Sequence, residues 1–373
     1  MNFDSKVRRC DLLPQYLNYK EEIDQSILRV LNSGIYTLSK EVQSFESEFA
    51  AYLGSRYCVT VASATDGIML SLKSISVGYG DEVITTPFTA IPTISAIVAS
   101  GATPVFADID PRTYLMDING TLEAITSKTK AIIPVHIFGN VFNVTELKRK
   151  LPRKLHILED SAQAHGSAMD GQKAGTFGEL GVFSFYPTKN LGAYGDGGAV
   201  VMHSPEAHRK LCLLRQYGMI DKDHTIMHGY NSRLDELQAA ILRIKLKYLD
   251  QMNIRRREIA TRYFDELDGK LIDFQSIPSN VSTNFHVLAG TVRSDRNKII
   301  DFLNKKGIQT NIYYPIPLHL QKANEYLGYK IGSLPNAEAL CERVIALPMY
   351  PEIPDSQLDE TISNLKSFYR KYT

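Results

Sequence analysis

Residues 181–203, GVFSFYPTKNLGAYGDGGAVVMH, hold one lysine between two apolar runs. The runs are typical of strands, and the loop between them carries Lys189 followed by several glycines. A lysine between two buried strands must reach water or be covalently neutralised, because a desolvated ammonium is costly. Glycines in such a loop allow tight turns and close approach to a ligand. Taken alone, the stretch fits a surface hairpin with a solvated lysine or, less commonly, a ligand-binding loop.

Two further predicted strands end in residues that could do chemistry. Residues 59–67, VTVASATDG, pass from a strand into a helix through small and hydroxylated residues. Backbone N–H groups at a helix start hold a phosphate well, and Thr65 adds a hydroxyl, although an ordinary N-cap has the same pattern. Residues 156–160, HILED, place two acids at the end of a buried strand. Glu159 and Asp160 would point to opposite faces, so we expect only one to face the site, where it needs a cationic or hydrogen-bonding partner.

The elements around these segments indicate an α/β fold. The predicted strands cover residues 58–62, 82–85, 104–107, 131–136, 156–158, 181–185 and 199–202, and most are joined by helical segments. Strands that are apolar throughout predict a mainly parallel central sheet covered by helices on both faces. Ligands gather at the carboxyl ends of the strands in such sheets. We therefore expect the three segments at one edge of the sheet.

The remaining chain adds helices before the sheet and a second domain after it. Predicted helices cover 18–31 and 42–52, and a long helix with an S-x-x-D start at 232–235 follows the sheet. Later pieces look like strands at 285–289 and 308–313 and like helices at 296–305 and 337–344. These patterns predict a large domain over 1–245 and a smaller α+β C-terminal domain over 246–373.

Composition argues against several classes of partner. Lys plus Arg number 42 against 41 for Asp plus Glu, so the net charge of +1 does not indicate nucleic acid or a charged membrane as a partner. The run RRRE at 255–258 is expected to be a solvated helix face. No run resembles a signal peptide or a membrane span, so we expect a soluble cytoplasmic protein. The four scattered cysteines suit reduced thiols, and the pair His224 and His228 has no evident third ligand, so no metal is expected.

A helix start, an isolated carboxylate and a loop lysine are the parts that a pyridoxal phosphate site needs. Five separated motifs also stand in order along the chain: SGIYTLSKEVxxFExEFA, EDSAQAHG, SFYPTKNLGAYGDGGA, GYNSRLDELQAA and YYPIPLHLQ. Together they resemble the DegT/DnrJ/StrS family of pyridoxal phosphate-dependent sugar-nucleotide aminotransferases. The resemblance implies the fold-type-I aminotransferase fold, with a large cofactor domain and a small C-terminal domain.

The resemblance also implies roles for individual residues. Lys189 would be the Schiff-base lysine, Asp160 the partner of the pyridinium nitrogen and Gln163 a contact to the phenolic oxygen of the cofactor. Three further residues match phosphate-binding positions, namely Ala64, Thr65 and Ser184. Asn231 would reach the phosphate from the neighbouring subunit, which implies a homodimer with shared active sites.

Two segments leave alternatives open. In residues 86–93, TPFTAIPT, Ala90 stands where many relatives carry an aromatic residue that stacks on the pyridine ring. Phe88 could supply the stack from a shifted position, or remain an ordinary core residue. Residues 313–319, YYPIPLH, have a backbone restricted by two prolines. The resemblance implies that Tyr314 and His319 contact the sugar nucleotide, whereas a rigid interdomain turn is the structural alternative.

The resemblance implies transamination of a nucleotide-linked keto-6-deoxyhexose, with dTDP as the expected nucleotide and glutamate as amino donor. The YYPIPLHLQ form resembles that of relatives that aminate C-3, and the alternative is C-4 amination of a UDP- or dTDP-linked 4-keto sugar. Relatives that dehydrate sugars replace the lysine with histidine, so Lys189 disfavours that reaction. A non-catalytic regulatory homologue is the remaining alternative.

Overall fold

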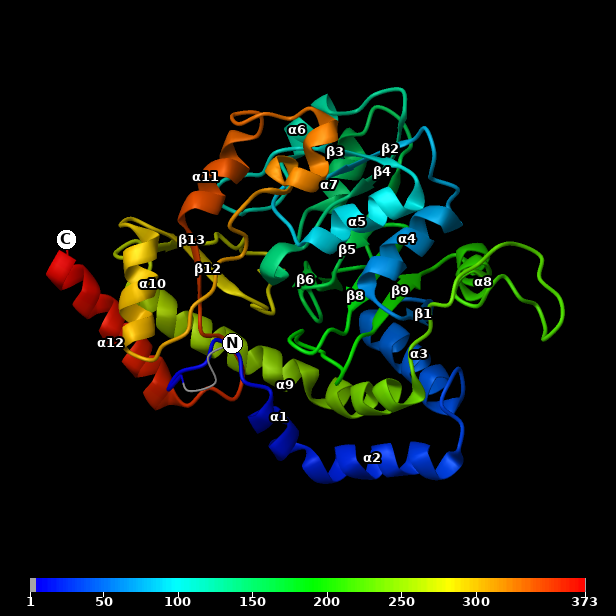
Figure 1. Cartoon of the computed structure of the whole chain (residues 1–373), viewed down its shortest axis with the longest axis horizontal. Helices are drawn as coiled ribbons and strands as arrows, with labels where there is room; N and C mark the ends of the chain where they lie inside the picture. The colour runs from blue at the N-terminus through cyan, green and yellow to red at the C-terminus, as the bar shows by residue number, and fades with distance from the viewer. Residues whose placement is uncertain (1–4, 373) are drawn as a thin grey trace.

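The computed structural model describes residues 5–372, which fold around a seven-stranded sheet (Figure 1). In sheet order the strands are β1 (Tyr57–Val61), β9 (Gly198–Met202), β8 (Leu180–Ser184), β5 (His156–Asp160), β4 (Thr129–Ile133), β2 (Glu82–Thr85) and β3 (Thr103–Phe106). β9 pairs antiparallel with β1 and β8, and the strands from β8 to β3 pair in parallel. The predicted α/β fold with a mainly parallel sheet is confirmed.

Both faces of the sheet are apolar and both are covered by helices. In β8, Val182 packs into the core under one helical layer and Phe183 into the core under the other, as alternation along a strand requires. The first layer contains α4 (Ala64–Ser74), α5 (Ile91–Ser100) and α8 (Pro205–Leu214), and the second contains α3 (Lys40–Leu53) and α9 (Glu236–Leu267). α2 (Lys20–Ser33) packs on the outside of α9 (Figure 1).

The lead-in helices follow their sequence patterns closely. α2 and α3 confirm the predicted helices over 18–31 and 42–52 to within two residues at each end. Each ends at a glycine in the left-handed conformation, Gly34 with φ 67° and Gly54 with φ 73°, a common C-terminal cap. A short helix α1 (Leu13–Asn18) precedes them and was not predicted.

The predicted S-x-x-D start of the long helix is wrong. α9 begins at Glu236, after Asp235, and no side chain caps it. Ser232 instead donates a hydrogen bond to Asp66 Oδ2 (2.7 Å) and accepts one from the Ala62 backbone (3.1 Å). The Ser232 hydroxyl binds to α4, which is far away in sequence, so the local pattern could not reveal its role. α9 runs without a break through the expected boundary at 245/246, and the division into domains stays a prediction.

The expected solvated face at 255–258 is wrong for Arg256. This residue is 4% exposed, because here α9 turns that face toward the C-terminal core. Its guanidinium donates to the carbonyls of Phe285 (3.2 Å) and Met349 (3.3 Å), which stabilise the buried charge.

The C-terminal part builds a second, antiparallel sheet. Its strands in order are β10 (Ile272–Phe274), β12 (Leu288–Val292) and β13 (Val344–Leu347), and α10 (Arg296–Lys305), α11 (Pro335–Arg343) and α12 (Asp355–Tyr372) surround it. The predicted strand at 308–313 is wrong. Only single bridges form there, from Ile308 to Val7 and from Asn311 to Ala346, because its two ends pair with different segments. The predicted strand at 285–289 begins only at Leu288.

Smaller elements fill the connections. They are α6 (Ile118–Glu123), α7 (Val144–Lys150), the short strands β6 (Ala168–Met169), β7 (Gln172–Lys173) and β11 (Val281–Ser282), and three 3-10 helices, η1 (Ile137–Gly139), η2 (Leu318–Leu320) and η3 (Lys322–Leu327). Between residues 5 and 372, every helix is too short or too polar to cross a lipid bilayer.

Candidate active site

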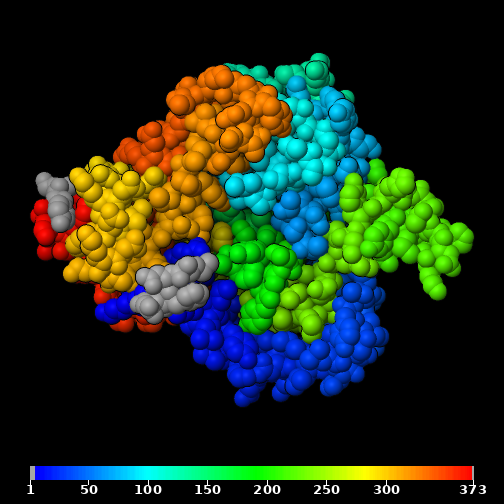
Figure 2. Space-filling view, viewed as in Figure 1, coloured from blue at the N-terminus to red at the C-terminus, as the bar shows by residue number. Residues whose placement is uncertain are grey.

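The lysine loop leaves the carboxyl end of β8 and is fixed by hydrogen bonds on both sides of Lys189. The Lys189 backbone N–H donates to the carbonyl of Tyr186 (2.8 Å). The Asn190 carboxamide donates to Asn253 Oδ1 on α9 (2.9 Å) and to the Asn284 carbonyl (3.0 Å). In Figure 2 the green segment that contains this loop reaches the surface near the middle of the face shown. The loop therefore holds its lysine in one place beside the surface.

The Lys189 amine is electrostatically unusual. Burial lowers its pKa to about 8, and the nearby Asp160 carboxylate opposes that shift. Its charge also contributes to the lowered pKa values of His165 and His286, although burial is the main cause for both. Among the described residues, nothing accepts a hydrogen bond from Nζ. An amine with a lowered pKa and no fixed partner is suited to covalent chemistry.

Asp160 ends β5 and is 5% exposed. Oδ2 accepts a hydrogen bond from Thr93 Oγ1 (2.8 Å) and Oδ1 accepts one from the Ala162 backbone (3.1 Å). Burial raises the pKa of Asp160, while these hydrogen bonds and the Lys189 charge oppose the rise. Within residues 5–372, no cationic side chain hydrogen-bonds to this carboxylate. A protonated ring nitrogen would supply the missing cation, so the site fits the pyridine of pyridoxal phosphate.

Glu159 serves a different part of the fold, as its alternation with Asp160 predicts. Its carboxylate accepts hydrogen bonds from the backbones of Gly175 (2.9 Å) and Gly178 (2.5 Å) and pairs with His136 Nε2 (2.7 Å). Alternation along β5 directs Glu159 to the opposite face of the sheet from Asp160. Glu159 is therefore a buried structural acid.

Thr93 is a site residue that the sequence reasoning missed. It lies in the first turn of α5, where its hydroxyl is also 3.2 Å from the Thr89 hydroxyl. From the sequence, segment 86–93 indicates only a stacking aromatic. The available signal was a hydroxyl near a helix start after a parallel strand, a place where polar groups meet a ligand.

Thr93→Val should lower kcat/KM by about tenfold, because it removes a hydrogen bond that favours the charged form of Asp160. We expect the Asp160 pKa to rise further, so the acidic limbs of kcat/KM and of the visible absorption of the bound cofactor should move to higher pH. Thr93→Ser keeps the hydroxyl and should restore both profiles. Acidic limbs that stay in place in Thr93→Val would contradict this role.

Gln163 and Tyr314 are brought together. Gln163 Oε1 accepts a hydrogen bond from the Phe138 backbone (2.9 Å), and its Nε2 donates to the Tyr314 hydroxyl (3.2 Å). Burial raises the pKa of Tyr314, so it stays a neutral phenol at physiological pH. The Asp160 charge also contributes to the raised pKa of Tyr314, so Tyr314 lies near that carboxylate.

The predicted phosphate-binding residues also converge. Ala64 and Thr65 begin α4, and none of the described contacts supplies a partner for their backbone N–H groups. Ser184 pairs with Gly198 in the β8–β9 register. A Cβ on Gly198 would lie 2.7 Å from Ala64 N, so this glycine lets β9 touch the helix start and brings Ser184 beside it. The free N–H groups and the hydroxyl suit a phosphate.

Asn231 is not brought to this cluster by its own chain in any described contact. It is exposed, and a single antiparallel bridge joins it to Gln216. It belongs to the connection between α8 and α9, part of which projects away from the body of the molecule (Figure 1).

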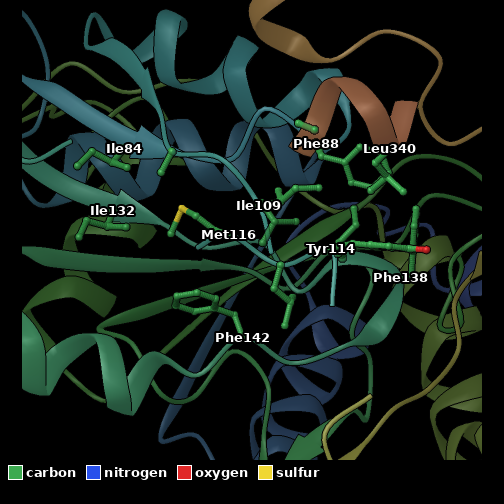
Figure 3. Close-up of a cluster of buried hydrophobic side chains, with 14 of the residues drawn as sticks. Ile84, Phe88, Ile109, Tyr114, Met116, Ile132, Phe138, Phe142 and Leu340 are labelled. Atoms are coloured by element: carbon green, nitrogen blue, oxygen red, sulfur yellow. The ribbon is translucent and has the colours of Figure 1, made fainter. Parts of the chain in front are cut away.

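Phe88 lies in the hydrophobic core and not on the surface of the site. Its ring is 0% exposed and makes edge-to-face contacts with Tyr114, Phe138 and Tyr314, at centroid distances of 6.2, 5.9 and 5.7 Å. Figure 3 shows Phe88 near Leu340 in the buried cluster that also contains Tyr114 and Phe138. The position of Phe88 therefore fits the alternative that it is an ordinary core residue. Ala90, at the start of α5, remains partly exposed.

His319 is also enclosed by protein. Its imidazole is 0% exposed, pairs through Nε2 with Glu338 Oε1 (3.0 Å) and lies edge-on to the rings of Phe106 and Tyr329. His319 links η2 to α11 within this chain, so its contacts fit the alternative of a rigid structural turn.

A metal site is a separate question. The described residues contain no cluster of three or more suitable ligands, and His224 pairs with Asp221 at 2.8 Å.

Comparison with known proteins places the chain in one family. Residues 18–366 match the DegT/DnrJ/EryC1/StrS aminotransferase family. A dTDP-3-amino-3,4,6-trideoxy-alpha-D-glucose transaminase of Micromonospora megalomicea subsp. nigra is 43% identical, over 95% of this chain and 96% of that protein. A UDP-N-acetyl-3-dehydro-alpha-D-glucosamine 3-aminotransferase of Acidithiobacillus ferrooxidans is 40% identical, over 96% of each. A "pleiotropic regulatory protein" of Geobacillus stearothermophilus is 40% identical, over 98% of this chain and 99% of that protein.

Solved structures of sugar aminotransferases have the same fold as this chain. The crystal structure of S. venezuelae DesV in complex with a ketimine intermediate has a TM-score of 0.94 and 38% identity, and 98% of each chain is covered. The PLP form of the sugar aminotransferase Spr1654 of Streptococcus pneumoniae has a TM-score of 0.88 and 28% identity, over 94% of this chain and 96% of that one. These similarities confirm the fold-type-I prediction and pyridoxal phosphate as the cofactor.

Proposed function

Because the chain belongs to the DegT/DnrJ/EryC1/StrS aminotransferase family, we propose that it transfers the amino group of glutamate to C-3 of a dTDP-linked 3-keto-6-deoxyhexose. The product would be a nucleotide-linked amino-deoxysugar. We further propose that it acts as a homodimer in the cytoplasm.

The observation that carries the proposal is nearly full-length similarity to transaminases whose names place the amino group at C-3, found together with an intact lysine site. Lys189, Asp160 and Gln163 stand at neighbouring places at one edge of the sheet. That arrangement disfavours the regulatory alternative, even though one relative carries a regulatory name.

Lys189 is the proposed covalent anchor and proton carrier. When bound, pyridoxal phosphate supplies an electrophilic carbon that takes up the amino group and a ring that withdraws electrons from the reacting carbon. With a pKa lowered to about 8, a useful fraction of Nζ is neutral near pH 8 and can accept a proton from the donor's α-carbon. The same nitrogen can return that proton, because both half-reactions share one site.

Asp160 would hold the pyridine nitrogen in its protonated state, with Thr93 fixing the orientation of the carboxylate. Gln163 would contact the phenolic oxygen, supported by Tyr314 and by the Phe138 backbone. The phosphate would lie between the start of α4, with Ala64 and Thr65, and the Ser184 hydroxyl.

A second subunit would complete the site. Asn231 is exposed and lies in the α8–α9 connection, part of which projects from the body of the molecule. This position supports contact between Asn231 and the cofactor phosphate bound in a partner subunit. His319 and Tyr314 were expected to face the sugar nucleotide, and the contacts of Tyr314 with Gln163 support it more strongly than the enclosed His319.

The test is an assay of purified protein with glutamate and four substrates: the 3-keto and 4-keto-6-deoxyhexoses, each linked to dTDP and to UDP. We expect amination of the dTDP-linked 3-keto sugar, with the new C–N bond located by NMR. Preference for the UDP-linked 3-keto sugar would change the nucleotide only, in line with the Acidithiobacillus relative. Amination at C-4 alone, or no amination of any sugar, would overturn the proposal.

A further inference from the structure

A small cavity lies beside the lysine loop, on the side of the C-terminal sheet. Its walls include Arg9 from the N-terminal segment, Thr188 next to the reactive lysine, and His286, Asn311 and Tyr313. Its volume is about 30 Å³, room for one or two water-sized groups and too little for a sugar ring. The cavity therefore suits the small charged end of a ligand.

Arg9 is a cation without an anionic partner. Its guanidinium donates through Nη1 to the hydroxyl of Tyr313, and its backbone is held by Gln309 Oε1 (3.3 Å) and by the Met349 N–H (3.2 Å). Across the described residues, no carboxylate forms an ion pair with it. A half-buried guanidinium that meets only a neutral phenol retains donors for a planar anion.

The other buried cations nearby already have acceptors. Arg256 donates to three backbone carbonyls, and Lys245 donates to the Gly192 carbonyl and lies 5.0 Å from the centre of the Tyr194 ring. His286 is neutral, because burial, Lys189 and Arg256 all lower its pKa. Lys189 is reserved for the cofactor in the proposed function, so among the described cations of this region Arg9 is the one left to bind an anionic ligand.

Asn311 supplies a second polar group in the cavity. Its backbone N–H and carbonyl both pair with Ala346 (3.1 and 2.8 Å), which fixes its position. Its carboxamide has no hydrogen-bond partner in the described part of the chain. A guanidinium and an amide donor on one small cavity together match the two oxygens of a carboxylate.

We infer that Arg9, assisted by Asn311, binds a carboxylate of the amino donor. The inference rests on the proposed transamination, since an amino-acid donor brings a carboxylate to the site in the first half-reaction only. The chain links this subsite to the cofactor contacts, because Tyr313 meets Arg9 while the next residue, Tyr314, meets Gln163. Arg9 would then select amino acids over simple amines and hold the α-carbon near Lys189.

The test separates the two half-reactions in single-turnover absorbance measurements on the enzyme loaded with pyridoxal phosphate. Arg9→Gln should raise the half-saturating concentration of glutamate by on the order of 30-fold, which is the effect of losing a charged hydrogen-bonded pair. The half-reaction with the nucleotide sugar should change by less than about twofold. Arg9→Lys should recover part of the loss, and Arg8→Gln, which alters the neighbouring arginine paired with Asp11, should resemble wild type.

Calorimetric titration with glutarate, a dicarboxylate without an amine, gives a readout independent of turnover. Glutarate should bind the wild-type enzyme and bind Arg9→Gln on the order of 30-fold more weakly. Equal binding of glutarate and of glutamate to both proteins, or a defect confined to the sugar half-reaction, would overturn the inference. A wild-type enzyme that ignores glutamate but binds glutarate through Arg9 would instead refute the proposed donor.

Donor analogues identify which carboxylate is bound. 4-Aminobutyrate lacks the α-carboxylate of glutamate, and norvaline lacks the side-chain carboxylate. The analogue without the group that meets Arg9 should react equally with wild type and Arg9→Gln, while the other keeps the full penalty of the substitution. A full penalty with both analogues would contradict a direct contact.

Discussion

Lys189→Ala should abolish transamination, with kcat reduced by a factor on the order of 10⁴ or more, because Lys189 is the group proposed to form the covalent bond and carry the proton. Wild-type protein with pyridoxal phosphate should show a visible absorption band that borohydride fixes onto one peptide containing Lys189. The variant should lose both the fixed label and the turnover.

The variant should still fold. In the described structure the Lys189 amine donates no hydrogen bond, and burial lowers its pKa from 10.5 to about 8. Its charge therefore opposes folding fully below about pH 8, and the effect fades as the pH rises to 10.5. The melting temperature of cofactor-free Lys189→Ala should therefore equal or exceed that of the wild type. Lys245 is an internal control, because burial also lowers its pKa to about 8. A borohydride label found on Lys245 would contradict the assignment of Lys189.

Asp160→Asn should reduce kcat by about 10² to 10³, since the protonated pyridine loses its buried anionic partner. The visible band should lose intensity from the ring-protonated form across neutral pH, while the cofactor stays covalently bound to Lys189. Glu159→Gln is the matched control: it alters the adjacent acid, which holds Gly175, Gly178 and His136, and should cost stability of about 1–3 kcal/mol with little change in the band.

Asp160→Asn should also change the stability of the cofactor-free protein in a pH-dependent way. Burial raises the folded-state pKa of Asp160 above its ordinary value of 3.8. The folded state then holds a proton that the unfolded chain has released, so stability from this group is present below pH 3.8 and is lost as pH rises through the folded-state pKa. At pH 7, cofactor-free Asp160→Asn should melt above the wild type, and below pH 4 the difference should vanish. A lower melting temperature at pH 7 would show that Asp160 is already stabilised by a partner.

Local patterns in the sequence were sufficient for the elements of the large sheet. Apolar runs bounded by glycine, proline and small polar residues mark β2 at the residues where it lies and the other strands of the sheet within a few residues. Periodicity is a local property, so it survives without knowledge of the partners. Residues 308–313 carry a similar local pattern but form only single bridges to two different segments, an outcome that a local pattern cannot reveal.

The chemistry at the three strand ends was also readable, because lysine, aspartate and a small-residue helix start are unusual after buried strands. These patterns pointed to Lys189 and to one of the acids Glu159 and Asp160, whereas the choice of Asp160 and of Gln163 came from the family resemblance. The structure brings Lys189, Asp160 and Gln163 to one edge of the sheet. Their catalytic roles remain predictions.

Tertiary structure alone decided which distant groups support that site. Thr93 meets Asp160 across 67 positions of sequence, and Arg9 meets Tyr313 across 304. Phe88 is drawn into the core by rings from three other segments, and Ser232 is recruited by Asp66. Such contacts depend on strand order and on how whole layers pack together. These features bring distant residues into contact, and the local sequence around each residue gives no sign of it.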